Sequence, residues 1–170
     1  MMPDVTLTAI TPADFRAIAR LADTIWRSHY ITMISAAQID YMLAGRHTSE
    51  KLCRYIESTK CWMQLLKVAG VPAGYCSYAL TGIRGEMKLQ ELYLLPEHRG
   101  TGLGKLMLRH VETEARSRGC TVLTLTVNKG NANSIAVYRK AGFTIREEAV
   151  FDIGNGFVMD DFVMTKSLTA

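Results

Sequence analysis

The 170-residue sequence has little net charge and no long apolar run, and these two absences exclude several classes of protein. Its 20 basic and 16 acidic residues leave a formal charge of +4 without a dense basic block, so we expect no binding of nucleic acid. No segment approaches the ~18 consecutive apolar residues of a membrane span, so we expect no membrane association. The N-terminal sequence MMPDVTLT lacks the charged and then apolar pattern of a signal peptide, which favours a cytoplasmic protein.

The sequence also lacks the paired cysteines that are typical of a zinc site or a disulfide framework. Its four cysteines form no Cys-x-x-Cys pair, so we expect reduced thiols in a cytoplasmic protein and no metal. Apolar residues make up 48% of the chain and charged residues 21%, a composition typical of a folded globular protein. No linker or internal repeat interrupts the chain, so we predict a single domain over residues 1–170.

Hydrophobic periodicity predicts a mixed α/β fold with one central sheet. Ser35 and Gln38 form a capping-box pattern at a helix start, and Gly-Asn-Gly at 154–156 indicates a tight turn between the last two strands. We expect Ile56 in the third helix and Leu106 in the fourth helix to face the core. The sequence predicts strands at 5–10, 62–68, 73–80, 89–95, 122–127, 143–151 and 157–166, and helices at 12–30, 35–44, 48–59, 103–118 and 134–141.

The stretch from Leu89 to Lys105, LQELYLLPEHRGTGLGK, has the pattern of a strand, a proline stop and a glycine-rich turn that opens into a helix. Pro96 ends the strand because it cannot donate a backbone hydrogen bond to a neighbouring strand. Glycines at 100, 102 and 104 expose backbone N–H groups beside the positive end of the helix dipole. This arrangement favours a phosphate-binding site.

Spacing excludes two familiar phosphate-binding motifs at this turn. A Walker loop requires Ser or Thr after its Gly-Lys pair and a glycine five residues before that pair, whereas Gly104-Lys105 is followed by leucine and Arg99 takes the earlier position. A Rossmann fingerprint requires a third glycine where this chain has Lys105. The motif present is Arg-x-x-Gly-x-Gly, formed by Arg99, Gly102 and Gly104.

A second motif follows downstream, with Asn131, then Tyr138 after six intervening residues, and then Gly142-Phe143. Together the two motifs resemble the signatures of the GCN5-related N-acetyltransferase (GNAT) superfamily, and the order of elements agrees over nearly the whole chain. The resemblance implies a single-domain α/β fold with a central sheet of about seven strands, mixed and mostly antiparallel, flanked by helices. It also implies a sheet that splays at an acetyl-CoA cleft.

By this resemblance acetyl-CoA is the acetyl donor, and no metal cofactor is implied. The N–H groups of the glycine-rich turn would cradle the pyrophosphate of coenzyme A, and backbone groups of the preceding strand would pair with its pantetheine arm. Asn131 could cap a helix and also contact the coenzyme. The residues expected to bind acetyl-CoA are Leu92, Tyr93, Leu94, Arg99, Gly100, Thr101, Gly102, Leu103, Gly104, Lys105 and Asn131.

Two residues are expected to move protons during acetyl transfer to an amine. Tyr138 matches the family's general acid, which gives a proton to the departing thiolate of coenzyme A, and the alternative is a core aromatic residue on a short helix. Glu91 interrupts an apolar strand where several family members carry a glutamate that removes the proton of the amine, and the alternative is a solvated strand residue. Ribosomal-protein N-terminal acetyltransferases of the family place a glutamate where this chain has Thr126, which counts against that mechanism.

The acceptor is expected to bind among the N-terminal helices and the last hairpin. The segment from Trp26 to Met42 and the C-terminal strand resemble the PaiA-like polyamine acetyltransferases of the family. A polyamine or another small primary amine is therefore the leading substrate, and Trp26, Tyr30 and Glu91 are expected to bind it.

Other interpretations stay open at this point. Asp152, Asp160 and Asp161 could attract a cationic substrate. A peptide N-terminus is the alternative acceptor, and a sensor that binds acetyl-CoA without catalysis is the alternative class of protein. Apolar surface near the final strands could support a homodimer.

Overall fold

A computed structural model describes residues 3–169 of the chain. These residues divide into two compact units, and both units include part of β4 (Glu86–Leu94) and part of α4 (Leu103–Ser117). The first unit runs to Ala79 and resumes over Glu91–Val111, and the second comprises Leu80–Gln90 and the chain from Glu112 onward. Residues 1, 2 and 170, at the ends of the predicted domain, lie outside the described residues, and the single domain over 1–170 stays a prediction.

The first unit contains three strands and three helices besides its parts of β4 and α4. The start of α2 carries the cap that the sequence predicts, since the Ser35 hydroxyl accepts from the Gln38 N–H at 3.1 Å. The Thr48 hydroxyl accepts from the Lys51 N–H at 3.3 Å in the same way. The elements are β1 (Val5–Ala9), α1 (Phe15–Tyr30), α2 (Ala36–Leu43), α3 (Ser49–Glu57), β2 (Cys61–Val68) and β3 (Val71–Leu80).

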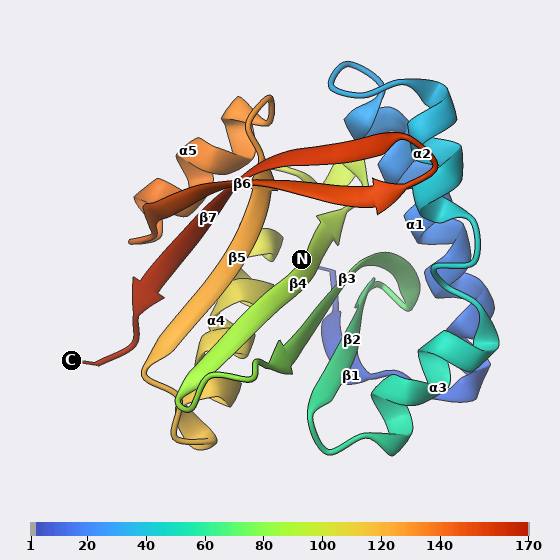
Figure 1. The fold of residues 1–170 in the computed structure, drawn as a ribbon. Coiled ribbons are helices and arrows are strands. Elements are labelled where there is room, and N and C mark those ends of the chain that lie inside the picture. Colours follow the sequence, from blue (N-terminus) through green and yellow to red (C-terminus); the bar gives the residue numbers. More distant parts are fainter. Residues whose placement is uncertain (1–2, 170) are drawn as a thin grey trace. The chain divides into compact units, whose positions relative to one another are not determined.

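The core of the first unit forms where α1 to α3 pack on β2 and β3. Ile18, Ile25 and Trp26 of α1 are buried together with Leu65 of β2 and Tyr75 of β3. Figure 1 shows the three helices grouped beside these strands. Each fully buried apolar side chain contributes about 1.5–3 kcal/mol to the free energy of unfolding, so this cluster holds the helices against the sheet.

Two residues expected in the core are exposed instead. Ile56 is 42% exposed because α3 ends one residue later and Leu52, one turn earlier, fills the buried position. Leu106 is 40% exposed because the buried face of α4 passes through Met107 and Val111. Neighbouring helical residues point about 100° apart, so Leu106 turns away from the face that Met107 buries.

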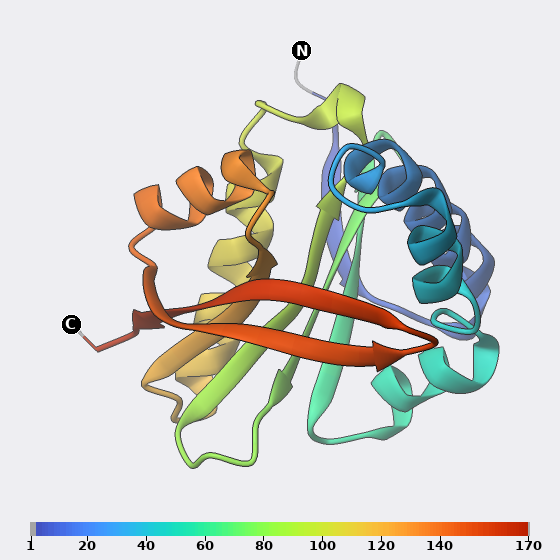
Figure 2. The same ribbon diagram turned by 45° about the horizontal axis from the view of Figure 1, so that its top comes forward.

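The second unit contains the first part of β4, the last part of α4, three more strands and one helix. β4 pairs with β5 in parallel, and β7 pairs antiparallel with both β5 and β6. β6 and β7 form a long hairpin (Figure 2). All three residues of its turn at 154–156 have a positive φ, which the Gly-Asn-Gly sequence predicts. The elements are β5 (Val122–Asn128), α5 (Ala132–Lys140), β6 (Thr144–Gly154) and β7 (Phe157–Ser167).

The strands follow the order β1-β2-β3-β4-β5-β7-β6. Because β1–β2 and β2–β3 are also antiparallel, the seven-stranded sheet is mixed and mostly antiparallel, which confirms the predicted fold class. β5 pairs with β7 along its whole length, but its parallel pairing with β4 joins only the starts of the two strands. This short pairing agrees with the splay that the resemblance implies. The β4–β5 pairs are Glu86–Val122, Met87–Leu123 and Lys88–Thr124.

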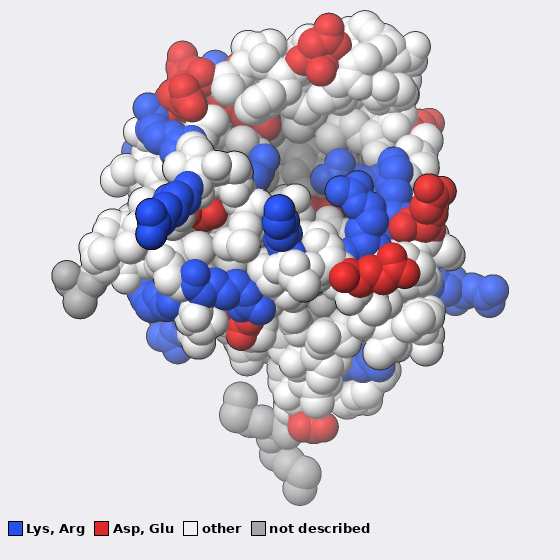
Figure 3. Space-filling model, turned by 60° about the horizontal axis from the view of Figure 1, so that its bottom comes forward, with Lys and Arg blue, Asp and Glu red and all other residues white. Residues whose placement is uncertain are grey.

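The cysteines, the helices and the surface charges were each considered in the sequence for metal, membrane or nucleic-acid binding. All four cysteines are free thiols, of which Cys76 and Cys120 are buried and Cys53 and Cys61 are partly exposed. Among residues 3–169, no helix combines the length and the apolar character that a membrane span needs. On the face drawn in Figure 3, lysine and arginine side chains are interspersed with aspartate and glutamate side chains.

Candidate active site

The glycine-rich turn connects β4 to α4 within the first unit. β4 ends at Leu94, a single 3-10 turn covers Pro96–His98, and α4 begins at Leu103. Gly100 and Gly102 have φ angles of 74° and 86°, left-handed values that residues with a Cβ rarely adopt. Glycine at these two positions is therefore a requirement of the backbone itself.

The space beside this turn is open to a ligand. A Cβ built on Gly100 or Gly102 would have no heavy atom of the described residues within 4 Å. The Leu106 N–H donates to the Gly102 carbonyl at 3.0 Å, so the N–H groups of residues 103–105 precede the first hydrogen bond of the 15-residue helix. Open N–H groups at a helix N-terminus suit a phosphate group.

Glu91 lies on β4, a few residues before this turn, and its side chain is only 4% exposed. The His47 Nε2 lies 3.2 Å from its Oε2, within hydrogen-bond distance. The Arg46 Nη2 lies 3.8 Å from its Oε1, which makes an ion pair. The alternative of a solvated strand residue is therefore wrong, because the carboxylate is buried beside the basic side chains of Arg46 and His47.

Opposing effects act on the pKa of Glu91. Burial raises this pKa, whereas the hydrogen bond from His47 and the charge of Arg46 lower it, and the net result lies below the usual value. The Tyr75 hydroxyl also lowers the pKa through a hydrogen bond to the carboxylate. Glu91 is therefore ionised at neutral pH even though it is buried.

The connection between α2 and α3 places Arg46 and His47 beside Glu91. Gly45 has a φ of 71°, and the Arg46 N–H donates to the Leu43 carbonyl at 3.2 Å, so the chain turns sharply where α2 ends. Thr48 then caps α3. Both ends of this short connection are fixed by hydrogen bonds, which restricts where its side chains can point.

Trp26 and Tyr30 belong to a cluster of four aromatic side chains with Tyr75 and Tyr93, and Tyr75 links this cluster to the Glu91 carboxylate. The Trp26 Nε1 donates to the Tyr75 hydroxyl oxygen at 3.2 Å, which leaves the Tyr75 proton free to face Glu91. The hydroxyls of Tyr30 and Tyr93 lie 2.9 Å apart. Trp26 and Tyr30 are nearly inaccessible to solvent, and their role in substrate binding stays a prediction.

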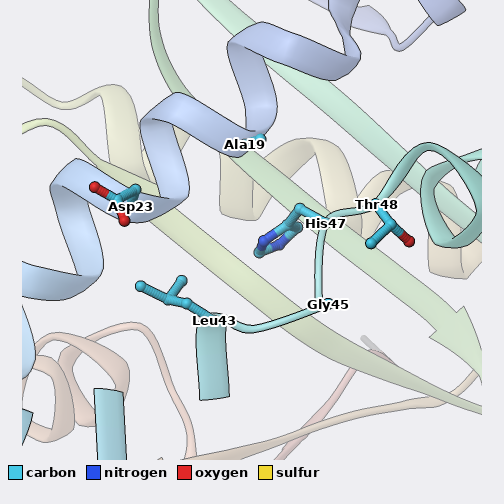
Figure 4. Close-up of a pocket in the computed structure, with 6 residues that line it drawn as sticks. All are labelled: Ala19, Asp23, Leu43, Gly45, His47 and Thr48. Atoms are coloured by element: carbon cyan, nitrogen blue, oxygen red, sulfur yellow. The ribbon is translucent and has the colours of Figure 1, made fainter. Parts of the chain in front are cut away.

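A pocket of about 190 Å³ opens beside His47 (Figure 4). Ala19 and Asp23 of α1 line one side of it, and the chain from Leu43 to Thr48 lines the other. Sequence reasoning missed Arg46, His47 and this pocket. No local pattern could have found them, because His47 and Glu91 are 44 positions apart in the chain.

The second motif forms one local group in the second unit. Asn131 caps α5, since its side chain accepts from the Ser134 N–H at 3.2 Å, and this confirms the capping interpretation. The Tyr138 ring packs edge-on against Phe143 with their centres 5.6 Å apart, and the Phe143 N–H donates to the Tyr138 carbonyl at 3.0 Å. Tyr138 is half-buried, and its role as a general acid stays a prediction.

The three carboxylates considered for cation binding have different surroundings. Asp152 accepts from the Gly154 N–H at 2.9 Å, and Asp160 pairs with Lys129 at 2.7 Å. Asp161 is buried, and its Oδ1 has no hydrogen-bond partner among the described residues. Burial raises the pKa of Asp161 to about 6.

Comparison with known proteins relates the two motifs to enzymes that transfer acetyl groups. The chain is 34% identical to the streptothricin acetyltransferase of Streptomyces lavendulae over 71 residues, which cover 42% of this chain and 38% of that protein. The chain thus spans less than half the length of this relative. It is 22% identical over 162 residues to the spermidine N(1)-acetyltransferase of Thermoplasma acidophilum, which covers 92% of this chain and 96% of that protein.

The fold and the family profile agree with these similarities. The crystal structure of the PaiA N-acetyltransferase of Thermoplasma acidophilum in complex with coenzyme A matches 96% of this chain and 99% of its own length, with a TM-score of 0.82 and 20% identity. At that identity the likeness shows the fold alone. The profile of the Acetyltransferase (GNAT) family matches residues 20–143, which include the glycine-rich turn, Glu91, Asn131 and Tyr138. The chain therefore belongs to the Acetyltransferase (GNAT) family.

Proposed function

We propose that the protein is an N-acetyltransferase that moves the acetyl group of acetyl-CoA to the primary amine of a small molecule, with a polyamine as the leading substrate. The observation that carries this proposal is the succession of two features along one segment of the first unit. β4 holds the buried Glu91 carboxylate, and the turn after β4 presents open N–H groups at the start of α4. A base and a phosphate-binding turn that lie this close in the chain suit a reaction between an amine and a donor that carries phosphate groups.

The glycine-rich turn and the end of β4 would bind the donor. Acetyl-CoA supplies an acetyl group that is activated as a thioester. Backbone N–H groups from Arg99 to Lys105 would bind its pyrophosphate. Backbone groups of Leu92, Tyr93 and Leu94 would pair with the pantetheine arm as an added strand does. The short pairing of β4 with β5, which covers Glu86–Lys88, supports this role for the rest of β4. Asn131 would add a contact to the coenzyme.

Glu91 and Tyr138 would handle the two protons of the reaction. An alkylammonium has a pKa of ~10.4, so a base must remove a proton before its nitrogen can attack the thioester. The ionised Glu91 carboxylate would accept that proton as the N–H bond breaks. The Tyr138 hydroxyl would give its proton to the sulfur as the C–S bond breaks, and the phenolate would regain a proton from solvent.

A small primary amine is the acceptor that the observations favour. Two relatives are named for small molecules, streptothricin and spermidine. Trp26 and Tyr30 belong to the aromatic cluster that includes Tyr75, the hydrogen-bond partner of Glu91, and this cluster would contact the alkyl part of such an amine. A peptide N-terminus is the second candidate, but Thr126 stands where family members with that activity carry a glutamate.

Release of the coenzyme A thiol tests this proposal directly. The purified protein is incubated with acetyl-CoA and a panel of polyamines, aminoglycosides, amino acids and N-terminal peptides, and thiol release is followed with a colorimetric reagent. We expect the highest kcat/KM with a polyamine or another small amine. Turnover of peptides alone would favour the second candidate. Tight binding of acetyl-CoA by calorimetry without turnover of any acceptor would contradict the enzyme and favour a sensor.

A further inference from the structure

We propose that His47 is a positioning residue that holds the Glu91 carboxylate in place, with Arg46 as the second basic side chain beside it. The connection between α2 and α3 would thereby decide over which pH range Glu91 can act as a base. This inference rests on the proposed role of Glu91 in the reaction. His47 acts through Glu91 and is not assigned a contact with either substrate.

Of the two basic side chains beside the carboxylate, His47 lies the nearer. The His47 Nε2 is 3.2 Å from Glu91 Oε2, whereas the Arg46 Nη2 is 3.8 Å from Oε1. The side chains of His47 and Glu91 are only 5% and 4% exposed, so water does not replace this contact readily. A buried carboxylate that loses a hydrogen-bond donor becomes harder to ionise.

The His47 ring is held by its surroundings from two sides. It lies edge-on to the Tyr75 ring, with their centres 5.8 Å apart and an angle of 78° between the ring planes. The caps at Gly45 and Thr48 fix the backbone on both sides of the histidine. The Arg46 guanidinium lies 4.8 Å above the Trp26 ring, which fixes the second donor as well.

The titratable groups around Glu91 divide into four weak acids and two basic side chains. Burial raises the pKa of Tyr55, Tyr75, Tyr93 and Cys76, with the Glu91 charge as a further cause, so all four stay neutral. The remaining groups are Arg46 and His47. The titratable groups that interact with Glu91 are Arg46 and His47 of the α2–α3 connection, Tyr55 of α3, Tyr75 and Cys76 of β3, and Tyr93 of β4.

The pocket beside His47 gives this inference a specific test. Figure 4 shows the His47 side chain among the residues that line the pocket, with Ala19 and Asp23 of α1 opposite. Removal of the imidazole would join the place of the ring to this open space of about 190 Å³. A free imidazole molecule could then enter and donate to Glu91 where the histidine did.

Three variants of the full chain separate positioning from a structural role. His47→Gln retains a donor of similar reach but removes the basic ring, and His47→Ala removes the donor. Asp23→Asn is the matched control, because Asp23 lines the same pocket but pairs with Arg27 at 3.0 Å. Circular dichroism and thermal unfolding check that each variant is folded.

Rates and infrared spectra are measured over pH. We expect His47→Gln to move the acidic limb of kcat/KM to higher pH by about one unit, since glutamine keeps a donor but lacks the basic ring whose electrostatic attraction lowers the pKa of Glu91. We expect His47→Ala to lose about 10-fold in rate at neutral pH and to regain activity on addition of imidazole. Asp23→Asn should behave like the wild type and show no response to imidazole.

An infrared titration tests the same inference without the reaction. The protonated-carboxyl band of Glu91 is assigned by its loss in Glu91→Gln, and it should titrate at higher pH in His47→Gln than in the wild type. An unchanged titration in the folded variant, or an unmoved acidic limb with no effect of imidazole, would overturn the role of His47. A wild type that titrates as expected but acetylates no amine would instead contradict the proposed function.

Discussion

At the scale of single residues, two buried carboxylates of this protein have opposite surroundings. Glu91 faces His47 and Arg46, which lower its pKa despite burial. Asp161 keeps one oxygen without a hydrogen-bond partner among residues 3–169, and burial raises its pKa to about 6 although Lys88 acts in the other direction. Glu91 is therefore stabilised as an anion, whereas a charged Asp161 lowers the stability of the folded protein.

Replacement of Asp161 by asparagine should stabilise the protein above pH 6. A carboxyl whose pKa is higher in the folded than in the unfolded chain adds stability below its unfolded pKa, ~3.9, and this contribution is lost as the pH rises through about 6. We expect Asp161→Asn to raise the free energy of unfolding by about 2 kcal/mol at pH 8 and to change it much less at pH 4. Urea unfolding at the two pH values measures this difference.

Asp160→Asn is the control for this prediction. Asp160 immediately precedes Asp161 on β7, but its carboxylate is 54% exposed and pairs with Lys129. Loss of an exposed ion pair changes stability by about 0–1 kcal/mol and should not depend on pH between 4 and 8 in the same manner. Equal effects of the two substitutions, or a loss of stability in Asp161→Asn at pH 8, would show that the Asp161 charge is not costly.

At the scale of elements, the motifs that lie within a few residues of one another were predictable from the sequence. The caps at Ser35 and Asn131 and the turn glycines at 100 and 102 each depend on local backbone geometry, which residue type reveals. Ile56 could not be placed, because neighbouring residues of one helix compete for the same buried position. The contact of His47 with Glu91 could not be predicted either, since it depends on how α2, α3 and β4 pack.

A second prediction, at the scale of elements, concerns Tyr138 on α5. Phenylalanine at this position keeps the ring that packs on Phe143 and removes only the hydroxyl. We expect Tyr138→Phe to lower kcat by about 100-fold, the usual contribution of a general acid, with little change in the affinity for acetyl-CoA or in thermal stability. Steady-state kinetics and calorimetry measure these quantities, and an unchanged kcat would exclude Tyr138 as the acid.

At the scale of the whole molecule, the family and the fold are established more firmly than the acceptor. The profile of the family covers residues 20–143, and the PaiA structure matches 96% of the chain. The seven-stranded mixed sheet could be predicted from the sequence, because strand and helix periods and two signature motifs agree over the chain. The acceptor could not be, since its pocket depends on side chains from several elements rather than on one motif.

The measurement that tests the account most directly is the pH dependence of acetyl transfer by Glu91→Gln, compared with the wild type, on the best amine of the panel. Glutamine keeps the shape of the side chain and can still bond to His47, but it cannot accept a proton. We expect kcat/KM to fall by about 100-fold or more at neutral pH, and the acidic limb that belongs to Glu91 to vanish. A variant that retains the wild-type rate and an unmoved acidic limb would show that Glu91 is not the base.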